Sequence, residues 1–126
     1  MTTIRSRKNK GKRLQNQVRD LLQEKYKDVL ELGDFKSTTM GESGLDIQLS
    51  PAARKVFSWA VECKNQEALN IWKSLEQAET NKEELKPLLV FKRNRTKTYV
   101  ALELTDFLNL LDANGEKTKT FKCQDK

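Results

Sequence analysis

The 126-residue sequence contains no histidine. This absence excludes mechanisms that need a histidine base and metal sites with histidine ligands, so any such chemistry must use carboxylates, lysines, amides or hydroxyls. Its two cysteines, Cys63 and Cys123, lie far apart, which indicates neither a disulfide framework nor a zinc knuckle. No apolar run approaches the roughly 20 residues of a membrane span, and the charged N-terminus lacks the apolar core of a signal peptide. We therefore expect a cytoplasmic protein.

Proline and glycine are also scarce, at two and five residues, while 37% of the chain is hydrophobic and 33% is charged. This composition favours one small globular domain over a disordered or collagen-like chain. We expect a basic disordered arm over residues 1–10, a folded domain over residues 11–115 and a polar tail over residues 116–126.

Positive charge is concentrated in two places. Lys and Arg outnumber Asp and Glu by 24 to 18, and the first 14 residues hold six cations and no acid. These six are Arg5, Arg7, Lys8, Lys10, Lys12 and Arg13. A second cluster consists of Lys92, Arg93, Arg95 and Lys97. Clustered cations attract a polyanion such as DNA by releasing its counterions, although a solubilising tail and an ordinary charged turn explain the two clusters equally well.

Hydrophobic periodicity predicts an α/β fold. Apolar residues at helical spacing indicate a helix over residues 11–31, and alternation indicates strands at 45–49 and 56–64. Residues 34–43 are interpreted as a short strand that runs into a turn, because Phe and Thr come early and Gly41 comes late. Asn70 is expected to cap a helix that reaches about residue 84. Strands follow at 88–91 and 98–102, and Thr105 is expected to cap a helix that ends at residue 111. This α-β-β-β-α-β-β-α order predicts a central mixed β-sheet flanked by helices.

Three charged residues point to chemistry at this sheet. Glu62 and Lys64 are two residues apart on a predicted strand, so their side chains share one face. Asp46 is the polar member of the preceding strand, and the three groups converge if the two strands are neighbours. Paired carboxylates suit a hard cation such as Mg²⁺ or Mn²⁺, and a nearby lysine can stabilise charge on a phosphate. The alternative is that Glu62 and Lys64 form an ordinary surface pair.

The pattern of residues 44–46 (GLD) and 61–64 (VECK) resembles the PD-(D/E)-x-K nuclease superfamily. Residues 10–13 (KGKR) and the turn at 41–44 (GESG) are similar to archaeal-type Holliday junction resolvases. The stretches at 62–66 and 70–73 resemble small phage-encoded endonucleases. The resemblance covers residues 8–110, and it implies a restriction-endonuclease-like fold.

The resemblance also implies roles for single residues. Asp46, Glu62 and the carbonyl of Cys63 would bind Mg²⁺ or Mn²⁺, and Lys64 would position the attacking water. Ser43 would hold a phosphate, and Gln77 matches a position near the site. Many members carry a glutamate on the first helix where this chain has Gln15, which leaves the number of metal ions open. Glu42 is a further candidate for the missing carboxylate.

Together these features predict a metal-dependent endonuclease that cuts DNA, a homodimer of the Holliday junction resolvase kind, acting in DNA recombination in the cytoplasm of a phage-infected host. One alternative is a nuclease of the same fold that acts on duplex, flap or end structures. Another is a DNA-binding module without catalysis, in which Gln15 marks a lost activity.

Overall fold

The computed structural model describes residues 3–39, 44–112, 119–122 and 124. Its helices and strands follow one another in the order α1 (Ile4–Lys25), the short 3₁₀ helix η1 (Leu32–Asp34), β1 (Phe35–Ser37), β2 (Ile47–Leu49), α2 (Pro51–Val56), β3 (Trp59–Asn65), α3 (Ile71–Asn81), β4 (Lys86–Lys92), β5 (Tyr99–Leu102) and α4 (Leu104–Leu110). The α/β class and the element order are as predicted, with α2 added between β2 and β3.

The main sheet has the strand order β3-β4-β5 and is mixed. β3 and β4 run parallel and are connected through α3, whereas β4 and β5 form an antiparallel hairpin. β4 is flanked on both sides, which agrees with its almost wholly apolar sequence; Leu89 is fully buried. β1 and β2 pair antiparallel as a separate two-stranded sheet.

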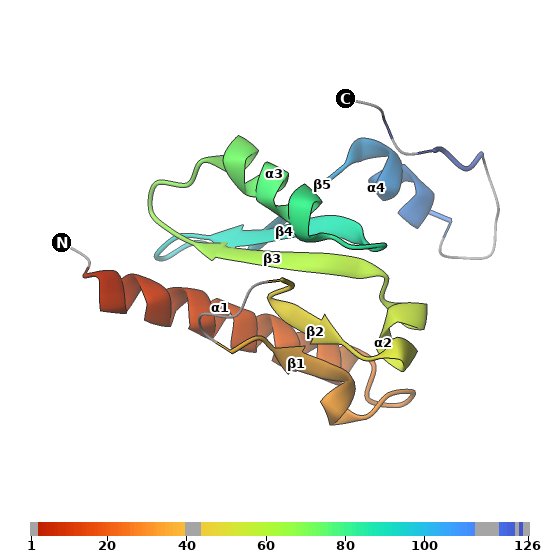
Figure 1. Ribbon diagram of the computed structural model, residues 1–126, viewed down its shortest axis with the longest axis horizontal. Coiled ribbons are helices and arrows are strands. Elements are labelled where there is room, and N and C mark those ends of the chain that lie inside the picture. The colour runs from red at the N-terminus through yellow and green to blue at the C-terminus, as the bar shows by residue number, and fades with distance from the viewer. Residues whose placement is uncertain (1–2, 40–43, 113–118, 123, 125–126) are drawn as a thin grey trace.

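The main sheet is sandwiched between α1 on one face and α3 on the other (Figure 1). Leu14 of α1 packs into a core with Phe35, Ile47 and Val61, all of them buried. Burial of Val61 and Cys63 on this face leaves Glu62 and Lys64 on the opposite face of β3, toward α3. The core therefore fixes which side of β3 carries the charged groups.

Two helix boundaries differ from the predictions. The hydroxyl of Thr3 accepts a hydrogen bond from the N–H of Ser6 at 3.1 Å and starts α1, so residues 4–10, predicted to be disordered, are helical. At the other end, α1 stops at Lys25, well before the predicted residue 31, and the backbone turns at Tyr26. The helix thus carries the predicted arm as a rigid extension.

The C-terminal helix also differs in detail. Glu103, and not Thr105, caps α4, because its side chain accepts from the N–H of Asp106 at 2.8 Å. Within the predicted tail, the side-chain amide of Asn109 exchanges two hydrogen bonds with the backbone of Phe121, both at 2.9 Å. The described part of the tail therefore contacts α4.

α1 is 22 residues long but strongly charged, and none of the helices formed by the described residues is both long and apolar enough to cross a membrane.

Candidate active site

Asp46, Glu62 and Lys64 come together at one cavity of about 590 Å³. Asp46 directly precedes β2, and its N–H donates to the carbonyl of Val61 at 3.3 Å. Its carboxylate accepts from the N–H of Cys63 at 2.6 Å. Lys64 Nζ lies 3.5 Å from the Glu62 carboxylate. The predicted convergence of the three side chains is confirmed. β2 and β3 belong to different sheets, and the two hydrogen bonds of Asp46 to β3 join them at this point.

The backbone before Asp46 is held in place by its neighbours. Thr38 donates its N–H to the carbonyl of Asp46 at 2.9 Å, and its hydroxyl donates to the carbonyl of Leu45. Gly44 adopts a φ of 101°, a left-handed conformation that glycine reaches without strain. The chain therefore turns sharply and presents Asp46 to β3. Glu42 and Ser43, both proposed from sequence, lie outside the described residues.

The two carboxylates are buried together, which opposes their ionisation. Burial raises the pKa of Asp46, although the hydrogen bond from the Cys63 N–H and the nearby Gln15 side chain act in the opposite direction. Burial also raises the pKa of Glu62, and the negative charge of Asp46 adds to this effect. Such a pair is stabilised by a proton or by a cation bound between the two groups.

The donor set fits a divalent cation that prefers oxygen. Within the described ranges no three His, Cys, Asp or Glu side chains lie close enough together to hold a metal ion by themselves, so a third protein ligand must come from another group. The N–H and C=O of a strand residue point to the same side, so the Cys63 carbonyl faces the edge where its N–H binds Asp46. Two carboxylates and one carbonyl leave room for water, which Mg²⁺ retains when proteins bind it.

Cys63 faces Asp46 with its backbone, whereas its thiol lies in the core. The side chain is buried in the core, and burial raises the pKa of the thiol far above its usual value. A protonated, buried thiol is a poor nucleophile and a poor metal ligand. Cys123 lies outside the described residues.

Gln15 of α1 lines the same cavity as Asp46 and Glu62. Its side-chain oxygen accepts from the Ser37 hydroxyl at 3.3 Å, and its side chain also acts to lower the pKa of Asp46. Lys12 donates to the same Ser37 hydroxyl at 3.1 Å and to the Thr38 carbonyl at 2.6 Å. Lys12 thus ties α1 to β1, a structural role beside its predicted contact with DNA.

Replacing Gln15 by glutamate is expected to strengthen metal binding about tenfold, because it adds a negative charge beside Asp46. Without metal, that charge raises the pKa of Asp46 further and lowers the melting temperature. Thermal unfolding with chelator and with excess Mn²⁺ measures both effects. Gln15→Met is the uncharged control, and an equal metal-induced shift in wild type and Gln15→Glu would contradict this role.

The structure adds a residue that the sequence reasoning missed. The side chain of Asn81, at the end of α3, lies near the Glu62 carboxylate and acts against the effect of burial on its pKa. Gln77, one turn earlier, lines the cavity at the predicted position. Residues four apart lie on one helix face, so the position of Gln77 was the signal that could have identified Asn81.

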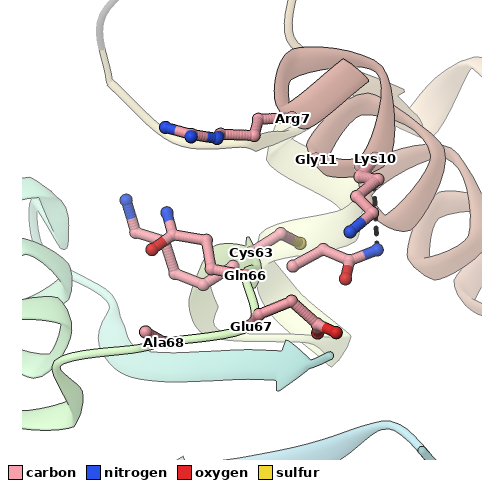
Figure 2. Close-up of a pocket in the computed structure, with 9 residues that line it drawn as sticks. Arg7, Lys10, Gly11, Cys63, Gln66, Glu67 and Ala68 are labelled. Atoms are coloured by element: carbon pink, nitrogen blue, oxygen red, sulfur yellow. Dashed lines mark hydrogen bonds between the residues drawn. The ribbon is translucent and has the colours of Figure 1, made fainter. Parts of the chain in front are cut away.

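Some of the predicted DNA-binding cations surround the site. Lys8 and Lys12 line the carboxylate cavity, and Arg7 and Lys10 line a neighbouring cavity of about 550 Å³. Figure 2 shows Arg7 and Lys10 on the α1 side of this cavity, opposite the loop that follows β3. Arg5 and Arg13 are exposed on α1 outside these two linings.

These cations lie where a helix tolerates them least. The first turn of α1 has no acidic residue, and positive charge near a helix N-terminus opposes the helix dipole. Clustering of these cations at the N-terminus of α1 therefore destabilises the helix. This favours a role of the cations in binding over a role in folding.

The second basic cluster forms the turn between β4 and β5. Lys92 and Arg93 line a third cavity of about 480 Å³, whereas Arg95 and Lys97 are exposed outside its lining. Thr96 closes the turn, since its hydroxyl accepts from the Arg93 N–H at 3.1 Å and donates to the Arg93 carbonyl at 3.0 Å. The structure thus separates cations that line cavities from cations on the outer surface.

Residues 6–125 match the family model described as "Phage putative PDDEXK endonuclease". Comparison with curated proteins and with solved structures gives no match.

Proposed function

The chain belongs to the phage PDDEXK endonuclease family, and on this premise we propose that it is a divalent-metal-dependent endonuclease that hydrolyses phosphodiester bonds in branched DNA. The observation that carries the proposal is the convergence of Asp46, Glu62 and Lys64 at one cavity, where burial opposes ionisation of both carboxylates and the charge of Asp46 further opposes that of Glu62. A catalytic site explains why a small domain retains this arrangement, because it lowers stability unless a cation is bound.

Asp46, Glu62 and the Cys63 carbonyl are the proposed metal ligands. Mg²⁺ or Mn²⁺ would there act as a Lewis acid toward water and the phosphate. Gln15 lies beside Asp46 and Asn81 beside Glu62, and both amides favour the ionised carboxylates that the metal requires.

Lys64 is the proposed cation for the reacting phosphate. Its ammonium group is only partly paired with Glu62, at 3.5 Å, and the side chain is 20% exposed, so it reaches both the carboxylate and the cavity. From this position it orients the attacking water and stabilises the negative charge that develops on the phosphate oxygens.

Lys8, Arg7 and Lys10 are the proposed contacts to the flanking backbone, because they line the site and the adjoining cavity. Such contacts position DNA without reading its sequence. The proposed substrate is a four-way junction, cut symmetrically on two strands. Symmetric cutting needs two active sites related by a twofold axis, so the proposal includes a homodimer.

A cleavage assay tests this function. The full-length protein is incubated with a labelled four-way junction and with a linear duplex of matched sequence, in Mg²⁺, Mn²⁺ or chelator. Symmetric metal-dependent nicks in the junction alone are expected. Equal cutting of both substrates would keep the nuclease and overturn the junction preference. Tight binding of DNA with no cutting under any condition would overturn the nuclease and support the binding-module alternative.

A further inference from the structure

The third cavity, near β5, combines apolar and cationic walls. Its apolar lining comes from Leu69, Ile71, Phe91 and Tyr99, and Lys92 and Arg93 line it beside them. The rings of Phe91 and Tyr99 are 6.3 Å apart at an interplanar angle of 35°. We refer to this cavity as the aromatic pocket.

Hydrogen bonds join the walls of the aromatic pocket. The Gln66 N–H donates to the Lys92 carbonyl at 3.2 Å and prolongs the contact between β3 and β4. The Glu67 carboxylate accepts from the Asn94 N–H at 2.8 Å and ties the loop after β3 to the basic turn. Glu67 is the acidic group of the lining, and this bond holds it against the turn. The pocket is therefore preformed.

Sheet register places the aromatic pocket beside the candidate active site. Lys64 is the register partner of Phe91 on β4, and Phe91 is the partner of Tyr99 on β5. Register partners point to the same face, so the three side chains form a row across the sheet. Two strand spacings separate Lys64 from Tyr99, roughly 10 Å.

The surface between the two sites is continuous. A small cavity of about 250 Å³ is lined by both Lys64 and Leu69, and Leu69 in turn lines the aromatic pocket. A DNA strand with a phosphate at Lys64 therefore reaches the pocket with a base one or two nucleotides away. Aromatic rings beside cations are the arrangement by which proteins hold unpaired bases and their phosphates.

We propose that the aromatic pocket receives one unpaired nucleobase of the DNA strand held in the active site. The base stacks on Tyr99, whose side chain lies on the edge strand and is 54% exposed, and Lys92 and Arg93 contact its phosphate. This inference rests on DNA being the substrate of the proposed function, and it adds a subsite that favours junctions, since their bases unpair readily at the branch point.

Binding in chelator tests the subsite without cleavage. Four-way junctions that each lack a single base, at successive positions around the branch point, are titrated with wild-type protein and with Tyr99→Ala at one fixed salt concentration. Wild type is expected to bind the junction that lacks the base at one particular position about tenfold more weakly than it binds the intact junction. Tyr99→Ala is expected to show the same loss on the intact junction and no further loss at that position.

Matched variants separate stacking from folding. Tyr99→Phe keeps the ring and should bind like wild type, whereas Tyr99→Thr keeps the strand propensity and should bind like Tyr99→Ala. Val100→Ala, at an equally exposed neighbour that points to the other face, is the control. Wild-type affinity of the Tyr99→Ala and Tyr99→Thr variants, or a loss that adds equally at every abasic position, would overturn the subsite. If the protein does not cleave in Mg²⁺ but Tyr99→Ala still adds no loss at that one abasic position, the proposed nuclease is overturned and the subsite stands.

Discussion

Replacing Glu62 by glutamine is expected to lower metal-dependent cleavage by more than 100-fold, to judge from the roughly 10–100-fold cost of removing mere supporting groups at metal sites. Glutamine keeps the shape of the side chain and its ability to accept a hydrogen bond but removes the negative charge. Initial cleavage rates in saturating Mg²⁺ measure the effect. Glu76→Gln, on the exposed surface of α3, is the matched control and should cleave at the wild-type rate.

The same substitution is expected to stabilise the metal-free protein near neutral pH. The folded-state pKa of Glu62 is raised, so ionisation of this carboxylate costs more in the folded than in the unfolded state. Above the folded pKa the whole penalty applies, and below the unfolded pKa it vanishes. The contribution of Glu62 to the free energy of unfolding therefore becomes less unfavourable as pH falls through this window.

Urea unfolding in chelator at several pH values measures this effect. At neutral pH the free energy of unfolding of Glu62→Gln should exceed that of wild type by about 1.4 kcal/mol for each pKa unit of the shift, and the difference should shrink on acidification. Lower stability of Glu62→Gln at neutral pH, or a cleavage rate equal to wild type, would contradict the assignment of Glu62 as a strained catalytic carboxylate. The two readouts together distinguish a catalytic role from a structural one.

Local patterns predicted the strand that carries the site. Alternation along β3 placed Glu62 and Lys64 on one face and Val61 and Cys63 on the other, and the core is built accordingly. Period-two alternation depends only on neighbouring residues, so the sequence contains it fully. The capping role of Asn70 was predictable for the same reason, and its side chain accepts from the Lys73 N–H at 3.0 Å.

Other features depend on distant segments or lack an apolar signal. The first turns of α1 hold one large apolar residue, Ile4, which is 69% exposed, so no hydrophobic period marked them as helical. The proximity of Asn81 to Glu62 depends on how α3 packs on β3. The row formed by Lys64, Phe91 and Tyr99 depends on the register of three strands, which no local pattern specifies.

Salt is expected to weaken DNA binding steeply, and the cations that line cavities should account for more of this dependence than those outside. The double variant Arg7→Gln/Lys10→Gln removes two charges from the cavity shown in Figure 2. Each lost phosphate contact should lower the slope of log affinity against log salt by about 0.9, so the pair lowers it by about 1.8. At 0.1 M salt this corresponds to a loss of roughly 50-fold in affinity.

Arg5→Gln/Arg13→Gln is the matched control for this experiment, since it removes the same charge from the same helix outside the cavity linings. Titrations of a junction in chelator from 50 to 200 mM salt, together with thermal unfolding, compare the two variants. Arg7→Gln/Lys10→Gln should melt no lower than wild type, because less positive charge near the N-terminus of α1 reduces repulsion by the helix dipole. Equal slopes for the two double variants would mean that α1 attracts DNA through its total charge alone, and the proposed path of the backbone along Arg7 and Lys10 would then be wrong. A smaller slope for Arg7→Gln/Lys10→Gln, at undiminished stability, would show that α1 retains its destabilising cations because they contact phosphates next to the catalytic carboxylates.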